Sequence, residues 1–298
     1  MTGRWRTTEV GATVALVGVT AVWGATFVVV KHAVERMPVM DFLAWRFTIA
    51  ALAMFAVRPR ALFALDARGR RAGVWLGLAL GAGYIAQTVG LQRTPATVSG
   101  FITGLFVVLT PLSAGLVLRR RVRASAWAGV GLATGGLALL SLRGLSVGTG
   151  EAITLICALA FALHIVGLGE WSSSRDAAGL AVLQLATVAV VSIVGAAPDT
   201  LRPPPDAGVW GAVLLTAVAA TAVAFFVQTW AQAHLPPIRA AVVMTMEPVF
   251  AGVFGVAVGG DRLGVRTVTG ALLVLAAMYV VELGPRRGAD SAVERLEV

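Results

Sequence analysis

The residue best placed to do chemistry is a glutamate inside an otherwise apolar stretch. Glu247 and Pro248 lie together within residues 236–259, which hold few other polar side chains. A charge in the core of a bilayer costs about 2.5–3.5 kcal/mol on insertion scales, and Pro248 has no backbone N–H, so the carbonyl of Met244 loses its helical partner. These groups predict a polar site for a solute or a proton on a kinked helix. The alternatives are a structural carboxyl bonded to a neighbouring helix and a protonated carboxyl without a role.

Two glutamines stand at matching places in two other apolar segments. Gln87 and Gln228 are 141 residues apart, and each follows an aromatic residue three positions earlier, Tyr84 and Phe225 respectively. Residues three apart lie on the same face of a helix, and a buried amide is costly unless it is bonded. The pairs predict the lining of a cavity for a planar or amphipathic solute. Amides that only hold helices together are the alternative.

A tryptophan and a histidine are matched at the same separation. Trp23 lies within residues 10–31, with Thr26 one turn later on the same face, and His164 lies within residues 149–169. We expect these side chains to line the same cavity, where an imidazole could also shuttle protons. Simple packing of the indole, and a hydrogen bond from the imidazole to a neighbouring helix, are the alternatives.

An arginine and a second proline predict parts that couple or gate the site. Arg46 follows Asp41 by five residues, about 7 Å along a helix, so we expect its side chain to extend to the outer interface and form a structural or gating ion pair. Substrate binding by Arg46 is the alternative. Pro111 is the counterpart of Pro248 and would free the carbonyl of Val107. Two kinked helices would then frame the cavity. The alternative is that the kinks only shape the packing of the helices.

Sequence patterns for other chemistry are missing. There is no G-x-S-x-G, H-E-x-x-H or Walker motif, Cys157 is the single cysteine, and the three histidines are far apart in the sequence. We therefore predict no catalytic residue, no cofactor and no metal site.

The composition shows what surrounds these residues. Of 298 residues, 58% are hydrophobic and 13% are charged, whereas an average soluble domain has roughly 25% charged residues. A soluble chain of this size cannot bury so much apolar surface, so the bilayer must be its solvent. The net charge of +9 comes largely from arginine clusters between apolar segments, which is typical of topology signals and not of nucleic-acid binding.

The apolar residues divide into ten segments, each near the roughly 20 residues that span a bilayer. The segments are residues 10–31, 40–57, 72–92, 95–118, 124–142, 149–169, 177–197, 207–232, 236–259 and 265–283. Most of the 24 lysines and arginines fall on one side when the N-terminus is cytoplasmic. The positive-inside rule then predicts a multi-pass protein of the cell membrane with both termini in the cytoplasm.

The two halves of the chain repeat one another. Gln87 falls on Gln228 at an offset of 141 residues, and Pro111 falls on Pro248 at an offset of 137. Five spans per unit is an odd number, so the second unit must be inverted in the membrane, as in many secondary transporters. The sequence predicts an all-α membrane protein with a first repeat at 1–143, a second at 144–285 and a disordered cytoplasmic tail at 286–298.

The motifs resemble those of the drug/metabolite transporter superfamily, specifically its EamA-type ten-helix members. They are Trp23-Gly24-Ala25-Thr26-Phe27 followed by Lys31, Ala44-Trp45-Arg46-Phe47, and Glu247-Pro248-Val249-Phe250-Ala251 followed by Gly260-Asp261-Arg262-Leu263. An acidic residue that members often carry after the fourth span is replaced by arginine, in Leu118-Arg119-Arg120-Arg121. The resemblance implies two five-helix bundles around a central cavity that moves small organic metabolites, commonly outward.

We therefore expect a secondary transporter that exports metabolites such as amino acids or amines across the cytoplasmic membrane by alternating access, with protons as a possible coupling ion. Without an arginine pair at mid-depth, zwitterions and cations are favoured over polyanions. The protein would act as a monomer or homodimer in the lipid bilayer, without nucleic acid. A passive facilitator or channel, a lipid scramblase, an intramembrane enzyme and a structural scaffold are the alternatives.

The residues expected to bind substrate are Trp23, Thr26, Tyr84, Gln87, His164, Phe225, Gln228, Met244 and Glu247. Those expected to couple or gate transport are Glu247, Arg46, Pro111 and Pro248.

Overall fold

Helices form nearly all of the chain that the computed structural model describes, which is residues 2–119, 121–143, 146–171, 177–232, 234–235 and 243–283. At a few helix and strand positions in these ranges, Phe225 among them, only the backbone is described. The first half contains α1 (Thr2–Val34), α2 (Val39–Val57), α3 (Pro59–Phe63), α4 (Ala67–Leu91), α5 (Ala96–Gly104), α6 (Phe106–Val117) and α7 (Ala124–Ser141). A two-residue antiparallel pair, β1 (Leu142–Arg143) and β2 (Ser146–Val147), follows.

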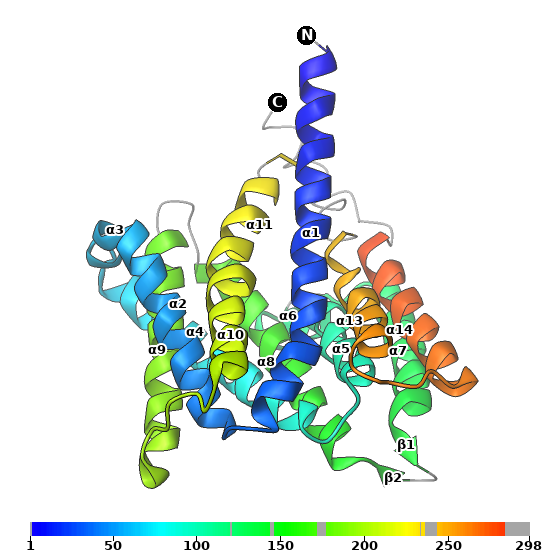
Figure 1. Cartoon of the computed structure of the whole chain (residues 1–298). Coiled ribbons are helices and arrows are strands. Elements are labelled where there is room, and N and C mark those ends of the chain that lie inside the picture. The colour runs from blue at the N-terminus through cyan, green and yellow to red at the C-terminus, as the bar shows by residue number, and fades with distance from the viewer. Residues whose placement is uncertain are drawn as a thin grey trace.

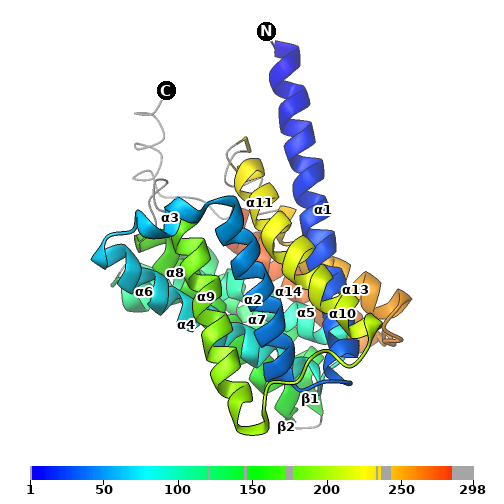
Figure 2. The same ribbon diagram turned by 60° about the vertical axis from the view of Figure 1, so that its left-hand side comes forward.

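The second half is again helical. It contains α8 (Thr149–Trp171), α9 (Ala177–Ala196), the 3-10 turn η1 (Ala197–Asp199), α10 (Ala207–Leu214), the π-helical segment η2 (Leu215–Val223), α11 (Ala224–Gln232), α13 (Glu247–Ala257) and α14 (Val265–Leu283). The segment from α10 through η2 to α11 is one continuous rod that passes between α1 and α2 (Figure 2).

The helices begin where the sequence supplies caps or prolines. The side chain of Asp66 caps α4 by accepting a hydrogen bond from the backbone N–H of Gly69, and Asp206 caps α10 in the same way. Such caps satisfy backbone donors that have no partner inside the helix. Pro38 and Pro95 directly precede α2 and α5, because proline cannot continue the helical hydrogen bonds behind it.

Apart from the short α3, the described helices largely coincide with the apolar segments expected from the sequence. Among the described residues, seven helices are long and apolar enough to cross a membrane, namely Glu9–Val34, Val39–Val57, Ala67–Leu91, Ala96–Val117, Thr149–Trp171, Ala178–Asp199 and Val265–Leu283. Shorter apolar helices cover Ala124–Leu140, Ala207–Val223 and Glu247–Ala257. The protein is therefore an all-helical, multi-pass membrane protein.

Helices of the first half pack against helices of the second. The closest partners are α7 with α14, α4 with both α8 and α9, α2 with α9, and α1 with α13. In Figure 1, α2 and α9 lie on one flank, α7 and α14 on the other, and the N-terminal turns of α1 project past the remaining helices. The two halves interlock, so residues from both contribute to the middle of the molecule.

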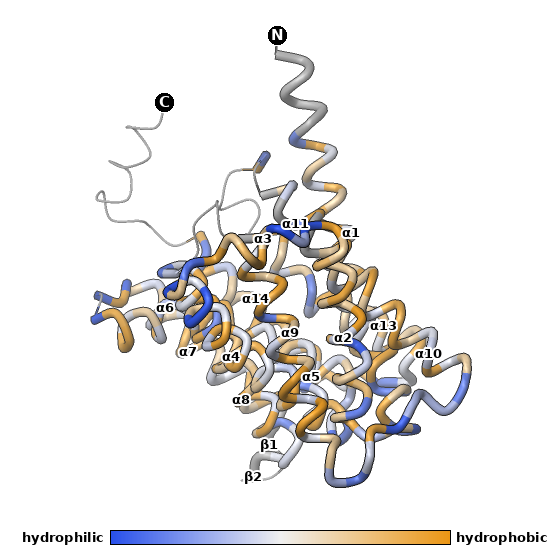
Figure 3. Tube along the Cα trace, turned by 90° about the vertical axis from the view of Figure 1, so that its left-hand side faces the viewer, coloured by the Kyte–Doolittle hydropathy of each residue, from blue (hydrophilic) through white to orange (hydrophobic). Residues whose placement is uncertain are grey.

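The outer surface is itself apolar along the helices. Large hydrophobic side chains such as Val14, Leu116, Trp127, Val253 and Leu272 are exposed, and the hydrophilic residues gather near helix ends and connecting loops (Figure 3). Exposed apolar area of this extent is unfavourable in water, whereas acyl chains of lipid accommodate it.

The structure places the two prolines differently. The helix expected over residues 95–118 divides at Leu105, between α5 and α6, and Pro111 lies inside α6. Pro248 lies in the first turn of α13, after a turn at residues 245–246, and does not kink a continuous helix. The first turn is where proline is best tolerated, because backbone N–H groups there have no helical partner.

Candidate substrate site

Glu247 opens helix α13 in the interior of the helix assembly. Its side chain is half-buried, and among the described residues it makes no hydrogen bond or ion pair. Glu247 is ten residues before Ala257, the end of α13, which is about 15 Å along the helix axis. A carboxyl at this depth is available to a solute or a proton.

Close packing fixes the position of α13. A Cβ atom on Gly24 of α1 would lie 2.7 Å from the backbone nitrogen of Ala251, and one on Gly104 of α5 would lie 2.7 Å from Cγ of Pro248. Real Cβ atoms do not approach so closely, so glycine at both positions lets α1 and α5 contact α13 directly. The helix that carries Glu247 is thus wedged between two helices of the first half.

Arg46 does not reach the interface as expected. Its side chain is 4% exposed and its guanidinium carbon lies 4.8 Å from the ring centre of Tyr84 and 5.1 Å from that of Phe47. Asp41 is also buried, at 3% exposed, but no ion pair joins the two. Residues five apart are rotated by about 140° around a helix, so they face different neighbours. The expected gating pair between Asp41 and Arg46 is therefore absent from this state.

Aromatic rings connect Arg46 to the second half of the chain. The ring of Tyr84 lies 4.8 Å from that of Phe47 and 5.3 Å from that of Phe161, centre to centre, with the Phe161 contact edge-on. Glu247 lies within electrostatic range of Tyr84 and of Cys157 on α8. The structure thus brings groups from α2, α4, α8 and α13 into one region, which we call the central cluster: Arg46, Phe47, Tyr84, Phe161 and Glu247.

Gln87 is the expected site residue nearest in sequence to this cluster. It lies one turn after Tyr84, is half-buried, and has no hydrogen bond among the described residues. Its counterpart Gln228 donates from Nε2 to Sδ of Met244 over 3.6 Å. The two glutamines therefore differ in this state, since only Gln87 has a free amide. The side chain of Phe225 is outside the described part of the structure.

Trp23 and Thr26 use their polar atoms within the helix assembly. The indole Nε1 of Trp23 donates to the backbone carbonyl of Ala220 over 2.8 Å, and the hydroxyl of Thr26 donates to the carbonyl of Trp23 over 2.6 Å. Ala220 lies in η2, a π-helical segment of the kind that often occurs at functional sites. Trp23 therefore ties α1 to the irregular part of the α10–α11 rod.

His164 bonds a residue that the sequence analysis missed. Its Nε2 lies 2.6 Å from Oε1 of Gln184 on α9, and Gln184 in turn donates to the carbonyl of Leu180 over 3.1 Å. Gln184 is 5% exposed. A polar residue inside the apolar run 177–197 was the available signal for it.

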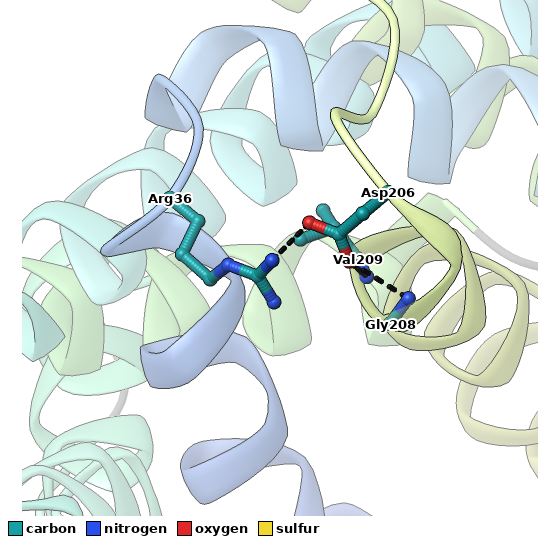
Figure 4. Close-up of polar contacts among 4 residues, drawn as sticks. All are labelled: Arg36, Asp206, Gly208 and Val209. Atoms are coloured by element: carbon teal, nitrogen blue, oxygen red, sulfur yellow. Dashed lines mark hydrogen bonds and ion pairs between the residues drawn. The ribbon is translucent and has the colours of Figure 1, made fainter.

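Polar contacts also connect neighbouring elements at the end of the molecule where α1 ends and α10 begins. Arg36 forms an ion pair with Asp206, whose other oxygen accepts from the N–H groups of Gly208 and Val209 (Figure 4). Nearby, Lys31 donates to the carbonyl of Thr94 over 2.7 Å. The ion pair joins the two halves, and the Lys31 contact ties α1 to the start of α5 within the first half.

A groove of about 260 Å³ lies beside this ion pair, between α1 and the α10–η2 rod. It is lined by Val29, His32, Ala33, Arg36, Gly208, Val209, Ala212 and Leu215. None of the expected site residues contributes to it, so it is separate from the central cluster.

Comparison with known proteins decides the family. The sequence profile of the EamA-like transporter family matches residues 10–142 and, a second time, residues 148–283. The chain belongs to the EamA-like transporter family. This confirms the resemblance drawn from the sequence motifs.

Other similarities of this EamA-like transporter agree. It is 34% identical over 273 residues to a protein of Archaeoglobus fulgidus named as an uncharacterized transporter. The aligned residues make up 91% of this chain and 86% of the relative. A crystal structure of a protein with 18% identity has the same fold, with a TM-score of 0.64 over 93% of this chain and 97% of the other. Family and relative indicate a membrane transporter and not an enzyme.

Proposed function

We propose that the protein is a secondary transporter that exports small organic metabolites, such as amino acids or amines, from the cytoplasm by alternating access. Its ten helical spans would form two inverted five-helix repeats, 1–143 and 144–285, around a central cavity. The two separate matches to one family, over residues 10–142 and 148–283, support this division. The seven longer apolar helices and the three shorter ones would together make ten spans.

The observation that carries the proposal is the carboxyl of Glu247 in the central cluster, which is half-buried and has no hydrogen bond or ion pair among the described residues. A scaffold protein gains nothing from such a group, because an unpaired charge among apolar helices is costly. A transporter needs a polar group that binds its cargo or a proton in one state and releases it in the other. The free amide of Gln87 supports the same interpretation.

The test is solute uptake by purified protein in liposomes, with a panel of amino acids, amines and nucleosides, with and without a pH gradient. We expect Glu247→Gln to abolish gradient-driven accumulation while exchange of labelled for unlabelled solute continues, because the amide keeps polarity but cannot carry a proton. Glu35→Gln is the matched control, since Glu35 is exposed on the loop after α1.

Two results would contradict the proposal. Unchanged accumulation by Glu247→Gln would remove this carboxyl from coupling. If no solute moves while a labelled lipid passes between the leaflets, the protein is a scramblase and not a solute transporter.

A further inference from the structure

Five exposed arginines lie where the chain leaves α2, passes through α3 and enters α4. They are Arg58, Arg60, Arg68, Arg70 and Arg71, and we call residues 58–71 the arginine segment. Asp66 is the only acidic residue between Asp41 and Glu151, and its side chain accepts from the backbone N–H of Gly69 over 2.6 Å. No aspartate or glutamate in the described part of the chain forms an ion pair with any of the five arginines. The segment therefore carries positive charge that the described structure does not neutralise.

Three of these arginines lie where a helix disfavours them. Arg68, Arg70 and Arg71 are the second, fourth and fifth residues of α4, and apart from the cap Asp66 no acidic residue lies near this end of the helix. The start of a helix carries partial positive charge, so it is stabilised by anions and not by cations. The helix itself gives no reason for three arginines at this position. An anion bound among them would remove the repulsion.

The exposed face of α4 changes from basic to aromatic to aliphatic along the helix. Arg71 is followed four residues later by Trp75, which is 65% exposed, and three residues after that by Leu78, which is 38% exposed. Residues three or four apart share one helix face, and Leu78 lies about 10 Å along the axis from Arg71. Headgroups, interfacial aromatic rings and acyl chains follow one another in the same order from the surface of a bilayer inward. A topology signal needs only the charges, whereas this face also orders the side chains by depth.

Helix α3 adds an aromatic ring between the arginines. Phe63 is 74% exposed, and its ring packs edge-on against that of Phe55 on α2, with the centres 6.2 Å apart. The backbone of α3 lies directly against α9, because a Cβ atom on Gly179 would collide with the carbonyl oxygen of Ala61. Together α3 and the start of α4 form an outer corner of the assembly (Figures 1 and 2). An exposed ring held at such a corner is favourable where headgroups meet acyl chains.

We propose that the arginine segment binds the phosphate of an anionic phospholipid, such as phosphatidylglycerol, in the leaflet that this corner faces. The guanidinium group matches two phosphate oxygens, and arginine clusters beside a membrane span attract anionic lipids. The exposed rings of Phe63 and Trp75 favour a lipid over a soluble phosphate, since they offer contact to acyl chains. This surface shares no residue with the central cluster and does not depend on the proposed transport function.

The experiment measures which lipid lies beside the arginines. Val74 is one turn after Arg70 and is 41% exposed, so a bimane fluorophore on Val74→Cys faces the lipid, while the native Cys157 is buried. The purified protein is placed in liposomes of phosphatidylcholine and phosphatidylglycerol, with one of the two lipids brominated in its acyl chains. Quenching of the bimane then gives the relative binding of the two lipids. We expect phosphatidylglycerol to be preferred about fivefold or more, the effect of one arginine close to a membrane surface.

A second position in the same protein is the matched control. Leu272 lies seven residues after the start of α14, as Val74 does after the start of α4, and it is 60% exposed. The arginine in the first turn of α14 is Arg266, which donates to the carbonyl of Ala138 over 3.2 Å. Bimane on Leu272→Cys should therefore report a preference within about twofold of one.

Removing the three arginines of α4 assigns the preference to them. The triple variant Arg68→Gln/Arg70→Gln/Arg71→Gln should lower the preference at Val74 to that of the control position. Its melting temperature in detergent without phosphatidylglycerol should not fall, because cations at a helix start are unfavourable. The two effects together separate lipid binding from a role in the fold.

A second triple variant and a soluble anion complete the controls. Arg93→Gln/Arg202→Gln/Arg262→Gln removes the same charge from exposed arginines elsewhere, and it should leave the preference at Val74 unchanged. Inorganic phosphate at millimolar concentration, with the ionic strength matched by potassium chloride, should also leave it unchanged.

Three outcomes would overturn the inference. Equal binding of the two lipids at Val74 in the protein with its arginines intact would do so, and this result does not depend on how any arginine variant folds. A preference that survives the loss of Arg68, Arg70 and Arg71 would leave these residues only a topological role. Loss of the preference in inorganic phosphate would mean that the segment binds soluble anions and not lipid.

Discussion

Hydrogen bonding separates two kinds of polar side chain in the apolar helices. Trp23 and His164 already have partners on other helices, Ala220 and Gln184 respectively, whereas Glu247 and Gln87 have none among the described residues. A bonded polar group stabilises the arrangement in which it is bonded. An unbonded one is free to bind a solute. At the scale of single residues, the second kind is therefore the better guide to the transport site.

His164 offers a test of that distinction. Removing the imidazole in His164→Ala leaves the amide of Gln184 buried at 5% exposure without its partner, and we expect a loss of about 1–3 kcal/mol in the free energy of unfolding. The melting temperature in detergent measures it. The double variant His164→Ala/Gln184→Leu should recover part of the loss, because no polar group is then stranded.

The transport assay on His164→Gln completes this test. Glutamine can restore the hydrogen bond but cannot titrate, so stability should return to near that of the wild type. Normal gradient-driven accumulation would then mean that the histidine holds helices together, and loss of accumulation would assign it to proton transfer.

At the scale of elements, glycines determine how α13 is held. The contact of Gly24 with Ala251 involves backbone on both sides, so it cannot relax by the rotation of a side chain. Gly104 performs the same role for α5 against Pro248. The position of Glu247 therefore depends on residues that have no side chain of their own.

Two glycines of the same helix give a matched comparison. Gly24→Ala should destabilise the protein by about 1–3 kcal/mol, as expected for overpacking, because the new Cβ forces α1 away from α13. Gly11→Ala, where nothing lies within 4 Å, should be neutral or slightly stabilising, since alanine favours helix more than glycine does. Melting curves of both purified variants check this, and equal melting temperatures would contradict the direct contact of α1 with α13.

At the scale of the whole molecule, the course of the chain puts its two helical ends on one face. Helix α1 begins and helix α14 ends on the same side of the assembly (Figure 1). An even number of crossings produces this arrangement, and ten spans are even. The arginine clusters then decide which face is cytoplasmic.

The orientation can be measured with single introduced cysteines. Gly264 is exposed and has nothing within 4 Å, and it precedes α14 on the face opposite the N-terminus. A membrane-impermeant thiol reagent should label Gly264→Cys in intact cells, whereas Ala67→Cys, exposed at the start of α4, should react only after permeabilisation. Cys157 is buried and should stay unlabelled. The reverse labelling pattern would contradict cytoplasmic termini.

The sequence alone determined the solvent, the family and the segments that become helices. Excess apolar residues require a bilayer whatever the fold, and hydropathy marks helix positions because a helix satisfies its own backbone inside lipid. The motifs around Trp23, Arg46 and Glu247 were sufficient to identify the family. None of these inferences depends on which helices are neighbours in the folded protein.

Only the tertiary structure decided which side chains meet. Distance along one helix placed Arg46 beside Asp41, but rotation around the helix axis turns the two apart, and Arg46 lies instead on Tyr84 of α4. His164 forms a hydrogen bond with Gln184, a residue that no repeat or motif indicated. Pro248 lies in the first turn of α13 and does not kink a continuous helix. Contacts between helices depend on packing of the entire assembly, and a sequence read one segment at a time does not contain that information.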